Sequence, residues 1–364
     1  MLHKSIFHVI GLMSGSSLDG LDICLVEFNV ENSLPVNSFS YKIITAECIE
    51  YNTIFRERLR EAPQLSAFEF AKLHTELGAN FGRLTADFIE KNEIKSLDFI
   101  VSHGQTIFHQ PKLGFTSQIG CGAQIAAQTK CKVICDLRSS DIAHGGQGAP
   151  IVPIAEKHLF PNYSAFLNLG GIANISFHKK ENEIYAYDVC AANTMLNYFA
   201  QQLHLNYDED GKIARKGNII PSLLNELNQI HFCQLSSPKS LGTEHVFQNW
   251  IACIKKYNNT IEDKMATAVE HIALQINQAI HTHKTENHST LLVTGGGAYN
   301  TFLMERIQLH SNLKIVIPDL YTIQYKEALA MAFIGLLRYL EIPNSLASVT
   351  GAQKDTIGGA IYLP

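Results

Sequence analysis

The order of apolar runs repeats along this chain, and the repeat restricts the folds open to it. Three strand-like runs, a helical stripe, a strand, a second helix and another strand follow one another in residues 6–136. The same order starts again at Ala165 and ends near residue 317. Alternating apolar residues indicate strands, and steps of three and four indicate helices. The pattern predicts an α/β protein with a duplicated core.

The repeat also predicts two domains. The expected strands cover residues 6–13, 22–30, 42–49, 97–102, 132–136, 165–169, 174–177, 184–189, 291–294 and 314–317. The expected helices cover 70–88, 122–129, a segment from Thr194, 262–283, a segment after Ala298, and 328–340. A turn-rich stretch, 143–153, lies between the halves. We expect an N-terminal lobe of residues 1–142, completed by 345–364, and a C-terminal lobe of residues 143–344, with a cleft between them.

The composition limits the partners of the chain. Its 364 residues are 46% hydrophobic and 17% charged, which is typical of a globular protein. The net charge of −5 argues against nucleic acid and anionic membranes as partners. The N-terminus lacks the features of a signal peptide, and the eight cysteines form no C-x-x-C pair. These features predict a cytoplasmic protein that acts on small molecules.

Four glycine-rich segments stand at the ends of expected strands. Glycine allows positive φ and a close approach of backbone amides to phosphate oxygens. The chain contains neither a G-x-x-x-x-G-K-[ST] nor a G-x-G-x-x-G motif, which argues against a P-loop or Rossmann site. One loop in each strand trio, with a late triple glycine before a helix, matches the layout of the actin-like ATPases. The segments are 11–20, 145–150, 168–174 and 294–300.

Four carboxylates are candidates for chemistry. Asp19 and Asp22 lie in or beside the first glycine loop, where they could hold Mg²⁺ or simply favour a turn. Asp188 ends an expected strand before a helix, so it could be a general base or a helix N-cap. Glu327 opens the last expected helix. It could take part in chemistry, or it could simply be an acidic residue in the first helical turn, where the helix dipole favours negative charge. The spacing of the histidines predicts no protein-held metal.

Several of these segments together resemble the anhydro-N-acetylmuramic acid kinases of bacterial cell-wall recycling, which have the two-lobed actin-like (ribonuclease H-like) fold. The matching segments occur in order along the whole chain. They are GLMSGSSLDGLD (11–22), SHGQTIFH (102–109), DLRSSD (136–141), GGQGAPIVP (145–153), NLGGIANIS (168–176), PKSLG (238–242), TGGGAYN (294–300) and Thr350–Gly351.

The resemblance implies a reaction and a set of site residues. Water would attack the anomeric carbon of 1,6-anhydro-N-acetylmuramic acid, and the released O6 would take the γ-phosphoryl group of ATP. Asp188 and Glu327 correspond to the catalytic acids. MgATP would contact Gly15, Ser16, Ser17, Leu18, Asp19, Gly20, Leu21, Asp22, Gly170, Gly171, Gly295, Gly296 and Gly297. The sugar would contact Gln105, Thr106, Arg138 and Asn193. A homodimer is a further expectation.

The chain departs from the family pattern on the sugar side. The family usually has Gly-Pro two residues after the catalytic Asp, where this chain has Cys190-Ala191. Ser139-Ser140 replaces an Arg-rich run, and Gly120-Cys121-Gly122 lies where the family often has Gly-Asn-Pro. On the nucleotide side the match is better, and Ser16 in place of a common Thr keeps the hydroxyl. A kinase for a related amino sugar, and a catalytically silent nucleotide-binding sensor, therefore remain alternatives.

Overall fold

The chain forms two compact units. The computed structural model describes residues 5–15, 18–31, 38–178, 184–237, 239–283 and 290–364. One unit comprises Met1–Phe160 and Tyr325–Pro364, and the other comprises Pro161–Gln324. The units divide the chain later than the expected boundary at residue 142 and earlier than the one at residue 344. One reason is that helix α5 (Pro153–Leu159) packs against strand β3 (Ser38–Glu50) of the first unit.

The first unit is built on a mixed sheet with strand order β12-β6-β4-β1-β2-β3, in which β5 also pairs with β4. The first three strands form an antiparallel meander, and β4 and β6 run parallel to β1. The strands not yet given bounds are β1 (Ile6–Ser14), β2 (Gly20–Glu31), β4 (Phe99–Gln110), β5 (Phe115–Ile119), β6 (Val133–Cys135) and β12 (Ala360–Tyr362).

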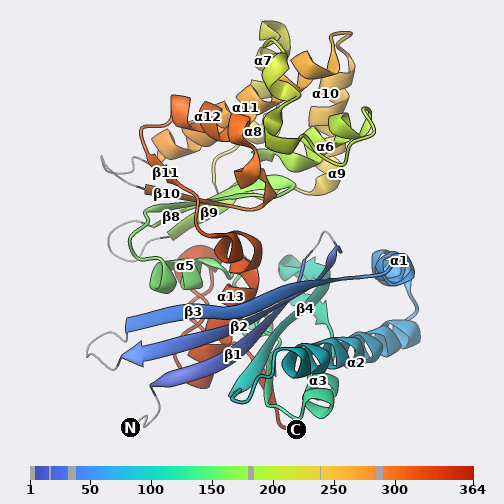
Figure 1. Ribbon diagram of the computed structural model, residues 1–364, viewed down its shortest axis with the longest axis vertical. Helices are drawn as coiled ribbons and strands as arrows, with labels where there is room; N and C mark the ends of the chain where they lie inside the picture. Colours follow the sequence, from blue (N-terminus) through green and yellow to red (C-terminus); the bar gives the residue numbers. More distant parts are fainter. Residues whose placement is uncertain (1–4, 16–17, 32–37, 179–183, 238, 284–289) are drawn as a thin grey trace. The chain divides into compact units, whose positions relative to one another are not determined.

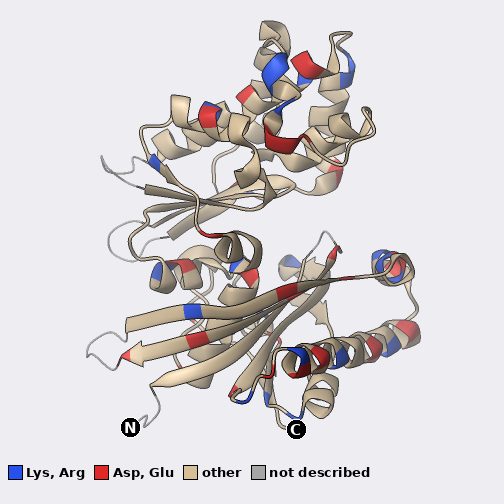
Figure 2. Cartoon of the chain, viewed as in Figure 1, with Lys and Arg blue, Asp and Glu red and all other residues tan. Residues whose placement is uncertain are grey.

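Helices cover both faces of this sheet (Figure 1). The long helix α2 buries Leu73, Leu77 and Phe81 in a core that also contains Ile10 and Leu12 of β1. Charged residues recur along its length (Figure 2), and Lys72, Arg83 and Asp87 among them are exposed, as an amphipathic helix requires. The helices of this unit are α1 (Thr53–Glu61), α2 (Ala67–Lys91), α3 (Gly122–Thr129), α4 (Ser139–Ala143), α5, α14 (Ala347–Thr350) and residues 325–339 of α13 (Leu320–Tyr339).

Gly11 sets how closely α13 approaches β1. A Cβ on Gly11 would overlap the carbonyl oxygen of Ala328 and would lie 3.0 Å from the backbone nitrogen of Ala332. We therefore expect Gly11→Ala to lower the free energy of unfolding by about 1–3 kcal/mol, the usual cost of an added core methyl group. Urea denaturation followed by circular dichroism measures this change.

Gly170→Ala is the matched control for Gly11→Ala. Its added Cβ would meet no atom closer than 3.7 Å, so this variant is expected to keep the wild-type free energy of unfolding. Equal stability of Gly11→Ala and the wild type would mean that α13 moves away from β1 without cost.

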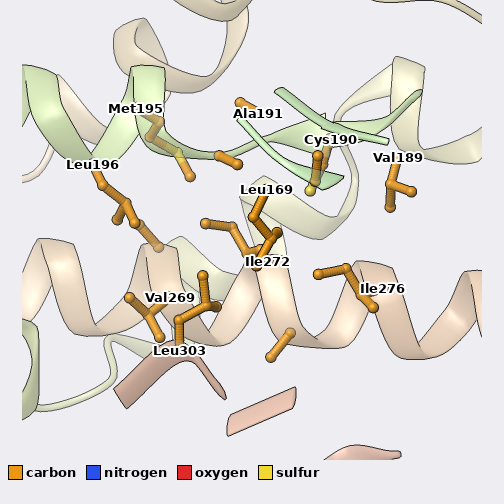
Figure 3. Close-up of a cluster of buried hydrophobic side chains, with 14 of the residues drawn as sticks. Leu169, Val189, Cys190, Ala191, Met195, Leu196, Val269, Ile272, Ile276 and Leu303 are labelled. Carbon is orange, nitrogen blue, oxygen red and sulfur yellow. The ribbon is translucent and has the colours of Figure 1, made fainter. Parts of the chain in front are cut away.

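The second unit repeats the arrangement with strand order β11-β10-β7-β8-β9. Its strands are β7 (Ala165–Leu169), β8 (Ile172–His178), β9 (Ile184–Ala191), β10 (Thr290–Thr294) and β11 (Lys314–Val316). Its helices are α6 (Asn193–Gln201), α7 (Pro221–Asn228), α8 (His231–Gln234), α9 (Thr243–His245), α10 (Ala252–Lys255), α11 (Ile261–Thr282), α12 (Thr301–His310) and the first residues of α13. The core packs Ile272 and Ile276 of α11 beneath Leu169 and Cys190 (Figure 3).

The two sheets share one strand order. In each, the third, second, first, fourth and fifth strands of the repeat lie side by side, and only the second is antiparallel to the first. The other two parallel pairings in the repeat are β4 with β6 and β10 with β11. This duplicated order is the ribonuclease H-like topology of the actin-like superfold, and it confirms the fold class that the repeating pattern predicts.

Candidate active site

The first glycine loop joins β1 to β2. Ser14, at the end of β1, is buried and donates a hydrogen bond from its Oγ to Oε1 of Gln105 (2.6 Å). Because that uses its only hydroxyl hydrogen, the Tyr51 hydroxyl donates to Ser14 Oγ (2.7 Å). Leu18 has a φ of 59° and closes a turn through its N–H to the Gly15 carbonyl (3.2 Å). Ser16 and Ser17 lie outside the described residues.

The rest of the loop presents one exposed carboxylate and one partly buried one. The Asp19 side chain is exposed, and its backbone carbonyl accepts the Tyr51 N–H (3.0 Å). Gly20 has no room for a side chain, because a Cβ would lie 2.5 Å from the Ile49 carbonyl oxygen. Asp22 pairs with Cys48 across β2 and β3. Burial raises the pKa of Asp22, the Cys48 thiol lowers it, and Asp19 raises it further.

Gln105 and Thr106, two of the residues expected to contact the sugar, form side-chain hydrogen bonds within this unit. Gln105 is buried, with its carbonyl oxygen on Ser14. The hydroxyl of Thr106 accepts a hydrogen bond from the Gln118 amide (3.1 Å) across the β4–β5 pair. Both side chains hold the strand ends near the first loop in place.

Arg138 follows β6 and is fixed by a neutral histidine. Its Nε and Nη2 lie 3.0 and 2.8 Å from Nε2 of His103, and Nη1 donates to the Gly148 carbonyl (2.7 Å). Burial, with the Arg138 charge, lowers the pKa of His103 to about 3. His103 is thus neutral, accepts at Nε2 and donates from Nδ1 to the Gly104 carbonyl (2.9 Å). The spacing of the histidines in the sequence gives no indication of this role for His103.

The charges of Glu327 and Arg138 act on each other, but Glu327 does not open its helix. Helix α13 begins at Leu320, so Glu327 lies in its interior, and the first-turn role is wrong. The helix starts earlier than expected because Asp319 accepts the Thr322 N–H (3.1 Å). The surrounding protein has the largest effect on the pKa of Glu327 and raises it, as does the Asp22 carboxylate. The positive charges of Lys326 and Arg138 lower this pKa. The side chain remains exposed, so solvent limits these effects.

Asp141 connects three motifs that the sequence showed only as separate segments. Its Oδ2 accepts the Gly148 N–H (2.7 Å), and its Oδ1 accepts the hydroxyls of Ser345 (2.9 Å) and Thr350 (2.7 Å). Asp141 is almost fully buried. It therefore holds the 145–153 loop and the Thr350–Gly351 turn beside Arg138.

A polar cavity of about 250 Å³ lies beside His103 in the first unit. Ser102, His74, Gln118, Asp136 and Ser139 are among the residues that line it. The Ser102 Oγ is buried and has no hydrogen-bond partner among the described residues.

The glycine loops of the second unit meet at one edge of its sheet. Strands β7 and β10 are parallel neighbours, so the loops that follow them lie together. Gly295 has a φ of 82°, and a Cβ there would lie 2.6 Å from Asn168 Oδ1. Asn193 joins the same group, with its Nδ2 on the Leu169 carbonyl (2.9 Å) and its N–H on the Gly170 carbonyl (3.1 Å). Gly170, Gly171, Gly295 and Gly296 thus lie at the same end of the sheet with their backbones at least partly exposed, whereas Gly297 is buried.

Asp188 is held by a segment that comes some fifty residues later. Its Oδ2 accepts hydrogen bonds from the Leu241 N–H (2.8 Å) and the Ser240 hydroxyl (3.3 Å), and its own N–H donates to the Lys239 carbonyl (3.2 Å). Burial raises its pKa, whereas Leu241, Ser240 and Lys239 lower it. The N-cap alternative is wrong, because α6 is capped by the Ala192 backbone and Asp188 lies within β9.

The residues that replace Gly-Pro after Asp188 are core residues. Cys190 and Ala191 are fully buried, and Cys190 points into the hydrophobic cluster of the second unit (Figure 3). The departure from the family pattern is therefore accommodated by packing.

Comparison with known proteins places this architecture in a family. The profile described as anhydro-N-acetylmuramic acid kinase matches residues 7–364. The chain belongs to the anhydro-N-acetylmuramic acid kinase family. A relative of that name from Aliivibrio fischeri is 34% identical over 368 residues, covering 97% of this chain and 98% of the relative. Another from Haemophilus influenzae is 34% identical over 391 residues, covering 100% and 99%.

The chain is also similar to a solved structure. It is the (R)-2-hydroxyglutaryl-CoA dehydratase component A of Acidaminococcus fermentans, with 13% identity, a TM-score of 0.47, and coverage of 90% of this chain and 96% of that one.

Across the part of the chain that the structure describes, no helix is both long enough and apolar enough to cross a membrane.

Proposed function

We propose that this protein is an ATP-dependent kinase that hydrolytically opens 1,6-anhydro-N-acetylmuramic acid and phosphorylates O6. The product would be N-acetylmuramic acid 6-phosphate, and the setting would be cytoplasmic cell-wall recycling. The observation that carries the proposal is the match to relatives named anhydro-N-acetylmuramic acid kinase over 97–100% of this chain.

Asp188 is the proposed base. Its carboxylate would take a proton from water on the face of the sugar opposite the departing O6, as the base of an inverting glycosidase does. The hydroxide oxygen bonds to the anomeric carbon, and the bond from that carbon to O6 breaks. The electron pair stays on O6, which attacks the γ-phosphorus of ATP and displaces ADP. Capture of the phosphoryl group removes the need for a separate acid at O6.

The glycine loops are the proposed nucleotide contacts. Phosphoryl transfer depends mainly on positioning and on neutralising charge. Residues 15–22 and the amides of Gly170, Gly171 and Gly295–Gly297 would contribute hydrogen bonds to ATP. No group of three or more His, Cys, Asp or Glu side chains among the described residues could hold a metal ion. Mg²⁺ would bind with the nucleotide, and the exposed Asp19 carboxylate is the oxygen ligand best suited to it.

Arg138 and Glu327 are the proposed sugar contacts in the first unit. Arg138 is held rigidly by His103 and Gly148, so its remaining N–H groups have a defined direction. Such a guanidinium suits the carboxylate of the lactyl group of the sugar. Glu327, the second catalytic acid that the resemblance implies, is exposed and would accept a hydrogen bond from a sugar hydroxyl. Gln105, Thr106 and Asn193 would act by holding the loops around the substrate.

A mass-spectrometric screen tests the proposed function directly. Purified protein and MgATP are incubated with 1,6-anhydro-N-acetylmuramic acid, free N-acetylmuramic acid, N-acetylglucosamine and the anhydro form of N-acetylglucosamine. The expected result is a phosphorylated and hydrated product from 1,6-anhydro-N-acetylmuramic acid. Preferred turnover of another amino sugar would contradict the proposed substrate. ATP binding without turnover of any sugar would contradict the proposed catalysis.

Asp19→Ala tests the nucleotide site. The variant is expected to lose at least about tenfold in turnover, because contacts with charged groups typically contribute about 1.5–3 kcal/mol. Its free energy of unfolding should change by less than about 0.5 kcal/mol, as at other exposed positions. Steady-state kinetics with varied MgATP measures the first quantity. Asp87→Ala, an exposed acid on α2, is the control and should keep wild-type kinetics; an equally active Asp19→Ala would remove Asp19 from the site.

A further inference from the structure

The segment Lys239–Leu241 carries a family motif for which the proposed reaction has no role. We propose that this segment is a positioning clamp for Asp188, which occupies one carboxylate oxygen and leaves the other to accept the proton from water. The inference rests on the proposed function for the identity of the reaction. The clamp itself rests on contacts within the second unit.

Backbone groups form the rigid part of the clamp. The Leu241 N–H donates to Oδ2 of Asp188 (2.8 Å), and the Asp188 N–H donates to the Lys239 carbonyl (3.2 Å). These two bonds fix both the main chain and the carboxylate of Asp188 to one short segment. Strand β9 also carries a bulge at Val189, between the pairs Ala173–Cys190 and Asn174–Asp188. Bulges redirect the side chains beside them, and they are common next to active sites.

Side chains complete the clamp on the same oxygen. The Ser240 hydroxyl donates to Oδ2 (3.3 Å), so both side-chain contacts of Asp188 end on one atom. Oδ1 accepts no hydrogen bond from any residue that the structure describes around it. A carboxylate with one occupied oxygen has a single basic atom, and its direction is set by the bonds to the other oxygen.

Lys239 supplies a positive charge that acts on Asp188. Its Nζ donates to the Phe232 carbonyl (3.0 Å) and lies 4.8 Å from the Phe232 ring centroid and 5.9 Å from that of Tyr187. The ammonium is therefore held near Asp188 without forming an ion pair with it. Besides Asp188, the titratable groups that act on the Lys239 charge are Cys190 of β9 and Cys233 of α8. Burial raises the pKa of both thiols, so they stay neutral near pH 7 and Lys239 is the charge that favours ionised Asp188.

The clamp predicts how the reaction depends on pH. Ser240 stabilises the ionised form of Asp188, so its loss should raise the pKa of this carboxyl. The base acts only when it is ionised, so activity decreases as the pH drops below the pKa of Asp188. With a raised pKa, this decrease should begin at a higher pH. We expect Ser240→Ala to move the acid limb of the kcat/KM profile upward by about 0.5–1 pH unit. Ser240→Thr keeps a hydroxyl and should restore the limb, and Lys239→Met should move it in the same direction as Ser240→Ala.

Two readouts test the clamp. One is the pH profile of kcat/KM on 1,6-anhydro-N-acetylmuramic acid. The other is an NMR titration of protein labelled with carbon-13 at the aspartate carboxyls, in which the Asp188 signal is identified by its absence from Asp188→Asn. The NMR titration needs no sugar, so it reports on the clamp even if the proposed substrate is wrong. Ser236→Ala, an exposed serine four residues before Ser240, is the matched control and should move neither readout.

The outcomes separate the two proposals. An upward shift of the Asp188 titration in Ser240→Ala, with recovery in Ser240→Thr, supports the clamp whether or not the wild type turns over the sugar. An unmoved titration in both Ser240→Ala and Lys239→Met overturns it. An equal loss of kcat/KM at every pH, without a shift of either readout, also overturns it, because it would indicate a purely structural role.

Discussion

Asp188→Asn is expected to lower turnover of the anhydro-sugar by about 10²–10⁴-fold, the usual contribution of a general base. Asn has nearly the same shape as Asp, and its carbonyl oxygen can still accept the Leu241 N–H that now binds Oδ2. The amide cannot take a proton from water. ATP binding and the free energy of unfolding should therefore remain close to those of the wild type.

Single-turnover phosphorylation in oxygen-18 water measures this loss and the path of the oxygen. Wild-type product should carry the label at C1, because water opens the anhydro bridge. Asp210→Asn is the matched control, since Asp210 is a partly exposed acid of the same unit that pairs with Lys212. Near-normal turnover by Asp188→Asn would remove Asp188 as the base, and unlabelled C1 would exclude attack by water.

Asp141→Ala is expected to lower the free energy of unfolding by about 2–5 kcal/mol. The change leaves the Gly148 N–H and the hydroxyls of Ser345 and Thr350 without their acceptor. A buried polar group without a partner costs about 1–3 kcal/mol, and losses within one network are not additive. Because Arg138 donates to the Gly148 carbonyl, activity should fall as well.

Chemical denaturation measures the effect of Asp141→Ala, and smaller changes to the same network calibrate it. Thr350→Val keeps the shape of the side chain and removes one donor, so it should cost about 1 kcal/mol. Asp141→Asn keeps an acceptor for two of the three donors. Its loss in free energy of unfolding should lie between those of Thr350→Val and Asp141→Ala. If Asp141→Ala unfolds at the same denaturant concentration as the wild type, the network does not stabilise the first unit.

Most strands and the long helices could be predicted because each depends on a local pattern, whereas the short helices, such as α7 and α10, were missed. Helix 122–129 and strand 165–169 have the predicted bounds. The boundary errors occur where tertiary contacts override the pattern. Strand β4 runs to Gln110 because it pairs with β5 beyond residue 105, and α13 begins at Leu320, well before the apolar stripe.

The site was less accessible to prediction than the fold. Glycine loops and Asp188 could be found because backbone flexibility and a strand-end carboxylate are visible in a short window. The partners of these residues are not. Ser240 lies 52 residues from Asp188, Arg138 lies 35 residues from His103, and Thr350 lies 209 residues from Asp141. No periodicity connects such pairs, because packing of the elements brings them together.

The sequence alone determined the two-fold repeat of strand and helix, the glycine loops at strand ends and the family, since each follows from residue type and spacing. The tertiary structure decided which groups each functional side chain contacts. It made His103 a neutral acceptor for Arg138, Asp141 the link between three motifs, and Lys239–Leu241 the support of Asp188. Hydrogen bonds depend on atomic distance and direction, and for residues far apart in the chain these exist only once the units have folded.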